Sequence, residues 1–172
     1  MAPTLLPGDI LFAARLAAPS AFQRGDLIIF QRSGTDTAPW TKRVIALPGD
    51  RVQLHEGRLH LNGKPVPRDD LGPYEVNEAG QPVVAERYRE TLPDSARPAF
   101  DVLEIADNQP FDNTPEYRVP EGHVFVLGDH RDNSLDSRAM ASFGFVPMTR
   151  VLAQPRFILW SRDWRRIGTR LD

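Results

Sequence analysis

Residues 124–138 read VFVLGDHRDNSLDSR, and they give the clearest indication of how this chain folds and where its chemistry lies. The first four residues are apolar and rich in β-branched and aromatic side chains, which predicts a buried strand. The next eleven hold acidic, hydroxyl and arginine side chains at a density that is typical of an ordered loop. The segment therefore predicts a strand followed by an ordered polar loop.

The polar loop allows several interpretations. Calcium binding is disfavoured, because Arg131 stands two positions after Asp129 and no glycine stands five positions after it, so the EF-hand pattern fails. The loop fits an internal ion pair better, and Asp136 with Arg138 is one candidate pair. Another role is a hydroxyl of Ser134 that orients a neighbouring catalytic group by hydrogen bonding. The remaining alternative is a polar turn that only satisfies its own backbone.

A second segment, KRVIALPGD at residues 42–50, contains a candidate general base. Strand alternation places Lys42 on one face with Val44 and Ala46, and it places Arg43 on the other. An apolar face would disfavour the ammonium form and lower the lysine pKa, as proton acceptance at neutral pH requires. The alternative is an ordinary strand lysine whose ammonium group lies in water.

The rest of the chain predicts a mainly β fold. Sixteen prolines and twelve glycines interrupt it every few residues, and no window sustains a long helical period. Glu56-Gly57 and Asn62-Gly63 are hairpin turn sequences, the second typical of a tight primed turn. The predicted strands are Asp9–Ala13, Asp26–Gln31, Thr41–Leu47, Arg51–His55, Arg58–Leu61, His123–Leu127 and Val151–Trp160.

Composition excludes several classes of protein. The 172 residues carry a formal net charge of -2 with both signs interspersed, so the broad basic surface of a nucleic-acid-binding protein is absent. There is no cysteine, which removes disulfides, thiolate zinc sites and cysteine nucleophiles. No run of 18 or more apolar residues is present, so the chain as displayed is expected to be soluble.

Metal and triad chemistry find little support. The histidines do not form the closely spaced cluster of a zinc enzyme, and no metal is predicted; they are His55, His60, His123 and His130. A Ser/His/Asp triad could be assembled from Ser134 or Ser142 with His123 and an aspartate. No glycine-flanked nucleophile elbow accompanies either serine.

Two segments differ in composition from the rest. Residues 64–120 are enriched in Pro, Glu, Asp and Arg, which indicates an insert: either a long surface excursion or a small second domain. Residues 160–166 mix tryptophan with arginine, which suits either a membrane surface or a solvated terminus.

Taken together, the segments resemble type I signal peptidases. The resemblance rests on MAPTL at residues 1–5, KRVIALPGD at 42–50 and GDHRDNSLDSR at 128–138, in that order, with RGDLIIF at 24–30 as a further match. It covers the chain from end to end, and the second and third motifs are long and specific. It implies a serine protease in which a lysine, not a histidine, activates the serine.

The resemblance also implies residue roles. Lys42 corresponds to the general base, and Ser134 to the hydroxyl that orients the lysine. Asp136 and Arg138 correspond to the ion pair that supports the site. Family members need no metal or organic cofactor.

The nucleophile of this family is the serine immediately before the motif that begins here with Met1. The nucleophile is therefore expected just before the first residue. A second serine, which assists in stabilising the oxyanion, is expected two residues further upstream. The N-terminal membrane anchor of the family would also precede Met1. The displayed chain is expected to be inactive by this mechanism, and neither Ser20 nor Ser33 lies in a motif that could replace the nucleophile.

The implied substrates are the signal peptides of exported preproteins, bound as extended strands with small side chains in shallow pockets before the cut. Met1, Leu5, Trp40 and Thr41 are expected to line those pockets, although Trp40 replaces a smaller aromatic residue. The implied location is the bacterial inner membrane, with the catalytic region on the periplasmic side.

The resemblance implies a β-rich catalytic core, residues 1–50 and 121–172, interrupted by an inserted β domain at 51–120. Two other functions stay open: a related protease that matures a pilin or conjugation protein, and a peptide-binding remnant that has lost catalysis.

Overall fold

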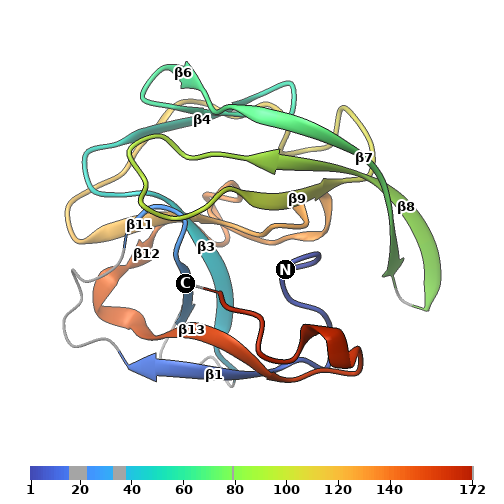
Figure 1. Cartoon of the computed structure of the whole chain (residues 1–172). Coiled ribbons are helices and arrows are strands. Elements are labelled where there is room, and N and C mark those ends of the chain that lie inside the picture. Colours follow the sequence, from blue (N-terminus) through green and yellow to red (C-terminus); the bar gives the residue numbers. More distant parts are fainter. Residues whose placement is uncertain (16–22, 33–37, 79, 172) are drawn as a thin grey trace.

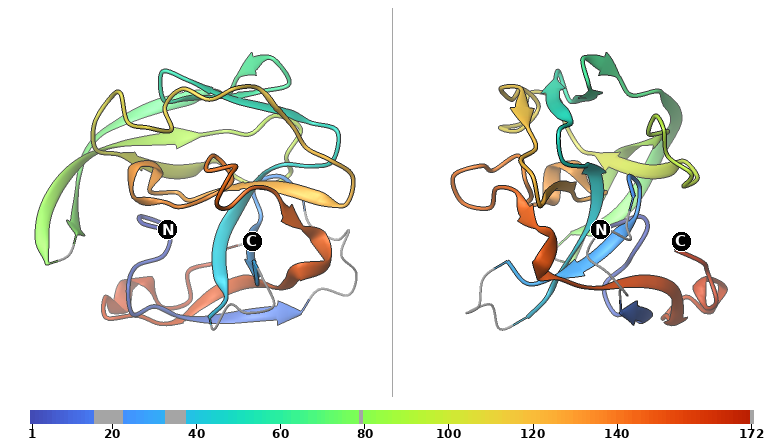
Figure 2. Two further views of the ribbon diagram at one scale, coloured as in Figure 1. Left: turned by 180° about the vertical axis from the view of Figure 1, so that it is seen from behind. Right: turned by 90° about the vertical axis from the view of Figure 1, so that its left-hand side faces the viewer.

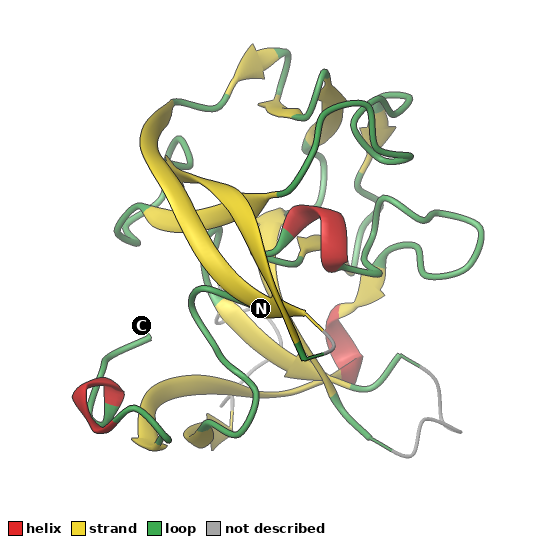
Figure 3. Ribbon diagram, turned by 90° about the vertical axis from the view of Figure 1, so that its right-hand side faces the viewer, coloured by secondary structure: helices red, strands yellow, loops and turns green. Residues whose placement is uncertain are grey.

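The computed structural model describes residues 1–15, 23–32, 38–78 and 80–171, and in these ranges the predicted mainly β fold is confirmed (Figure 1). Strands dominate, and the only helices described are three short 3-10 turns (Figure 3). No helix among the described residues is long and apolar enough to cross a membrane.

A six-stranded antiparallel sheet holds both ends of the chain. In order across the sheet, the strands are β1 (Ile10–Arg15), β13 (Val151–Trp160), β2 (Leu27–Phe30), β3 (Trp40–Ala46), β11 (His123–Leu127) and β12 (Val146–Pro147). Since β3 pairs with β2 on one side and with β11 on the other, the two main sequence motifs lie side by side.

Residues between β3 and β11 form two smaller sheets. Asn62 and Gly63 both have positive φ, 54° and 77°, as the primed turn predicted from their sequence requires. One sheet has the order β10 (Tyr117–Arg118), β4 (Arg51–His55), β5 (Arg58–Leu61) and β6 (Lys64–Pro65); the other has β7 (Arg68–Glu78), β8 (Gln81–Glu90) and β9 (Phe100–Glu104).

The long hairpin of β7 and β8 differs from the sequence expectation. Figure 2 shows it as a curved arm at one side of the molecule, and it pairs from Arg68 with Glu90 to Glu78 with Gln81. Its prolines, glycine and many charged side chains obscure the alternation, and the register shifts between Asp70 and Pro73. No strand bounds could therefore be predicted for this region from the sequence pattern.

The largest hydrophobic cluster lies between the sheets. Ile45 and Phe125 of the six-stranded sheet share it with Leu54 of the four-stranded sheet and Val102 of the three-stranded sheet. The smaller sheets occupy residues 51–118, close to the expected insert, but their core is continuous with that of the larger sheet. The division into two domains stays a prediction.

Candidate active site

Lys42 lies at the centre of a buried hydrogen-bonded chain. It is only 7% exposed on β3, and its Nζ donates to Oγ of Ser134 at 2.7 Å. That hydroxyl in turn donates to Oδ2 of Asp136, also at 2.7 Å. The structure thus brings together a lysine, a serine and an aspartate that are up to 94 residues apart in the sequence. The alternative of a lysine with its ammonium in water does not agree with this burial.

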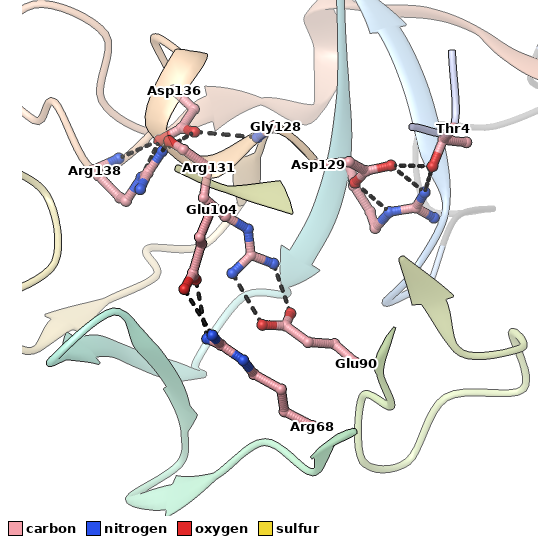
Figure 4. A network of polar contacts seen from close by, with 10 residues as sticks. Thr4, Arg68, Glu90, Glu104, Gly128, Asp129, Arg131, Asp136 and Arg138 are labelled. Carbon is pink, nitrogen blue, oxygen red and sulfur yellow. Dashed lines mark hydrogen bonds and ion pairs between the residues drawn. The ribbon is translucent and has the colours of Figure 1, made fainter. Parts of the chain in front are cut away.

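Asp136 and Arg138 form a buried two-pronged ion pair (Figure 4). Nε of Arg138 donates to Oδ1 at 2.8 Å and Nη2 donates to Oδ2 at 2.9 Å, while the N–H of Gly128 reaches Oδ2 at 3.1 Å. Burial alone would raise the pKa of Asp136, but the Arg138 charge and these hydrogen bonds lower it overall. Asp136 is therefore a fixed negative charge beside Ser134.

Gly128 leaves the space that Ser134 occupies. A Cβ at this position would lie 2.2 Å from Oγ of Ser134 and 3.3 Å from Nζ of Lys42, which is far too close for the first contact. Gly128 could not be assigned a role from the sequence. Its place directly after the buried strand was the available signal, because a glycine there permits close approach.

The surroundings of Lys42 lower its pKa. Burial lowers the pKa of Lys42; the Asp136 charge opposes this shift and Arg138 adds to it. Arg43, which strand alternation places on the opposite face from Lys42, is also buried, at 5% exposed. The six-stranded sheet is covered on both faces here, and Asp129 neutralises Arg43 at 2.6 Å.

We expect Lys42 to lose its proton at a lower pH than a free lysine side chain, whose pKa is about 10.4. Because the pKa of Lys42 is lower in the folded than in the unfolded state, its contribution to stability is fully present above the unfolded value. It is lost as the pH falls through the folded value. NMR titration of the isotope-labelled Lys42 side chain measures its pKa. A value equal to that of a free lysine would contradict the expectation.

Interactions of Met1 and Thr4 hold the N-terminal segment near Lys42. Burial lowers the pKa of the Met1 amino group, Asp129 raises it and Lys42 lowers it, so this group lies within electrostatic reach of both side chains. Oγ1 of Thr4 donates to Asp129 and accepts from Arg43 at 3.2 Å. These contacts fix the position at which a residue preceding Met1 would begin.

Arg166 holds the same segment from the C-terminal side. Its Nη2 donates to the carbonyl oxygen of Thr4 and to Oδ2 of Asp9, each at 2.8 Å. Neither Thr4 nor Arg166 could be assigned to the site from the sequence, because their partners are distant in the chain.

The four expected substrate-binding residues fall into two groups. Met1 and Leu5 line a cavity of about 630 Å³, together with residues of β7 such as Tyr74. Trp40 and Thr41 are not among its lining residues. Trp40 packs edge to face on Phe143, 5.6 Å between ring centres, and its ring lies 5.8 Å from Nζ of Lys42. Thr41 pairs with Ile29 of β2.

The described residues contain no group of three or more histidine, cysteine or acidic side chains that could hold a metal ion. His55 and His60 face each other across β4 and β5 with ring centres 6.2 Å apart, and His123 contacts the carbonyl oxygen of Glu121. The Ser134 hydroxyl contacts Lys42 and Asp136. The site is thus built on lysine, serine and aspartate.

The fold and the site define a mainly β protein organised around a buried lysine that is hydrogen-bonded to a serine. Comparison with known proteins gives its family: a family model described as "Signal peptidase, peptidase S26" matches residues 1–160. The chain belongs to the signal peptidase family.

Curated relatives are named Signal peptidase I. The protein of Rickettsia canadensis (strain McKiel) is 36% identical over 158 residues, covering 88% of this chain and 56% of the relative. That of Rickettsia bellii (strain OSU 85-389) is 38% identical over 155 residues, covering 88% and 52%. The chain therefore spans about half the length of these relatives. A crystal structure of a signal peptidase I from Enterococcus faecalis V583 matches with a TM-score of 0.42 and 26% identity, covering 77% of this chain and 94% of that one.

Proposed function

We propose that this chain is the catalytic region of a signal peptidase I, which removes N-terminal signal peptides from exported preproteins by cutting after small residues. The observation that carries the proposal is the buried Lys42, whose lowered pKa and hydrogen bond to Ser134 suit a general base. Membership of the signal peptidase family supports it.

The proposed mechanism uses a serine immediately before Met1 as the nucleophile. Neutral Lys42 accepts the proton of that hydroxyl as its oxygen attacks the scissile carbonyl, and Lys42 then donates the proton to the leaving amine. Ser134 orients Nζ of Lys42, and the pair of Asp136 and Arg138 holds Ser134. The electrostatic influence of Lys42 on the Met1 amino group supports a nucleophile attached at this point.

The proposed partners follow from the same assignment. Signal peptides bind as extended strands, with Met1, Leu5, Trp40 and Thr41 near the side chains before the cut. The complete protein is anchored in the bacterial inner membrane by a segment preceding Met1, and this region lies on the periplasmic side. Nucleic acid is not a proposed partner. The proposed domains are a discontinuous core, residues 1–50 and 121–172, and an insert at 51–120.

The test is to extend the chain at its N-terminus with a serine and the upstream residues of the source gene. This extended protein is expected to cleave a fluorogenic signal-peptide substrate after its small residue, as measured by mass spectrometry of the products. The matched control carries alanine in place of the added serine and should not cleave. A folded extended protein that binds the peptide without cutting it would overturn the enzymatic assignment in favour of a peptide-binding remnant.

A further inference from the structure

The loop that carries Ser134 is attached to a different sheet from the one that carries Lys42. In the six-stranded sheet, β11 ends at Leu127 and the chain then passes to the edge of β9. There the N–H of Leu103 donates to the carbonyl oxygen of Asp129 at 2.9 Å, and Leu103 forms an isolated parallel bridge with His130. The loop therefore continues the three-stranded sheet of β7, β8 and β9.

Asp132 makes a second attachment to that sheet. Its Oδ2 accepts the N–H of Ile105 at 2.6 Å and the N–H of Ala106 at 3.1 Å, just beyond the end of β9. Two hydrogen bonds from successive amides to one carboxylate oxygen fix the loop relative to the strand. Asp132 stands two residues before Ser134, so this attachment acts close to the hydroxyl that contacts Lys42.

Glu90 and Arg131 make the third attachment, and it is almost fully buried. Glu90, the last residue of β8, is 1% exposed, and Arg131 is 2% exposed. Nη2 of Arg131 donates to Oε2 of Glu90 at 2.6 Å and Nη1 donates to Oε1 at 3.1 Å (Figure 4). The main-chain carbonyl of Arg131 also accepts Nη2 of Arg138, the partner of Asp136. A continuous path of polar contacts thus runs from β8 to Asp136.

The cost of burying these charges makes the attachment specific. A guanidinium remains charged in proteins, so buried Arg131 requires a carboxylate at one place and in one orientation. Removing only the Glu90 carboxylate leaves the Arg131 charge buried without a counter-charge. Movement of the loop toward water would hydrate that charge. The position of the loop therefore depends on Glu90.

We propose that Glu90 and Asp132 are positioning residues, which hold the loop of residues 129–134 on the three-stranded sheet so that the Ser134 hydroxyl stays on Nζ of Lys42. This inference rests on the proposed role of Lys42 as the base. The three-stranded sheet then supports the reaction indirectly, by positioning the loop, while the residues of its strands contribute no group to the reaction.

The experiment compares Glu90→Gln with Glu104→Gln. Both variants remove a negative charge near Arg131, but Glu104 is hydrogen-bonded to Arg68 and only Glu90 is hydrogen-bonded to Arg131. Lysine side-chain NMR titration reads Lys42 directly, and exposed Lys64 serves as the internal reference.

In Glu90→Gln, the loop should move and water should reach Nζ of Lys42. Because burial is the largest cause of its lowered value, the pKa of Lys42 should rise. In Glu104→Gln it should stay at the wild-type value. Equal pKa values of Lys42 in the two variants would overturn the proposal. This readout needs no nucleophile, so it separates failure of the positioning role from failure of the proposed protease function.

Asp132→Ala tests the proposal if Glu90→Gln does not fold. It removes the two hydrogen bonds from Ile105 and Ala106 at a half-buried side chain, and it leaves no buried charge without a partner. The pKa of Lys42 should again rise, and an unchanged value would overturn the proposal. In the extended protein, either variant should lower kcat about 10- to 100-fold with little change in KM, as expected when a catalytic group is displaced by about 1 Å. The alkaline rise of the pH profile should move up with the pKa of Lys42.

Discussion

Lys42→Met in the extended protein is expected to lower kcat/KM for a signal-peptide substrate by about 10⁴-fold or more, as loss of a member of a catalytic unit does in well-studied serine proteases. Methionine preserves most of the volume of the side chain and suits a buried position, so the fold should remain. The substitution removes the proposed proton acceptor. The measurement is steady-state cleavage, with thermal unfolding to show that the variant is folded.

Lys64→Met is the matched control, because Lys64 is exposed on β6. Its activity should equal that of the unaltered extended protein. A folded Lys42→Met variant that retains more than about a tenth of the activity would show that another group accepts the proton, and the assignment of Lys42 as the base would be wrong.

Asp136→Asn has the second large expected effect, a loss of about 3–5 kcal/mol in the free energy of unfolding. Asp136 is 0% exposed and Arg138 is 3% exposed, so the substitution leaves a buried guanidinium without its counter-charge. Urea denaturation measures the loss. Because the pKa of Asp136 is lowered in the folded state, its stabilising contribution is present above the unfolded value and is lost as the pH falls through the folded value. The variant should lack this part of the acid dependence.

Glu116→Gln provides the comparison for Asp136→Asn. Glu116 pairs with Arg51 at 3.7 Å, but the two side chains are 44% and 54% exposed. An exposed pair of this kind contributes at most about 1 kcal/mol. Similar losses from the two substitutions would mean that burial of the Asp136 pair has no special importance for stability.

Local pattern was sufficient for the strands whose neighbours in the sequence are clear turns. Four predicted strands have the bounds found in the structure: Arg51–His55, Arg58–Leu61, His123–Leu127 and Val151–Trp160. The last two are rich in β-branched or aromatic residues. The first three have a Gly or Asp directly beside them, whereas Val151–Trp160 lies between Arg150 and Ser161. The hairpin of β7 and β8 escaped detection because its pairing depends on contact between two polar strands, and neither one shows a clear period of two.

The site was predictable only as far as its motifs extend. Ser134, Asp136 and Arg138 lie within five residues of one another, so their grouping could be expected from the sequence. The contact of Glu90 with Arg131 joins residues 41 positions apart and leaves no local pattern. The burial of Arg43 could not be anticipated either, because strand alternation does not reveal that both faces of a sheet are covered.

Gly128 has a consequence for how this site could be switched off. The hydroxyl of Ser134 occupies the volume where any other residue would carry its first side-chain carbon, 2.2 Å away. A single methyl group introduced there, as in Gly128→Ala, would block the position of the Ser134 hydroxyl. It would separate serine from lysine while every charged group of the site kept its identity.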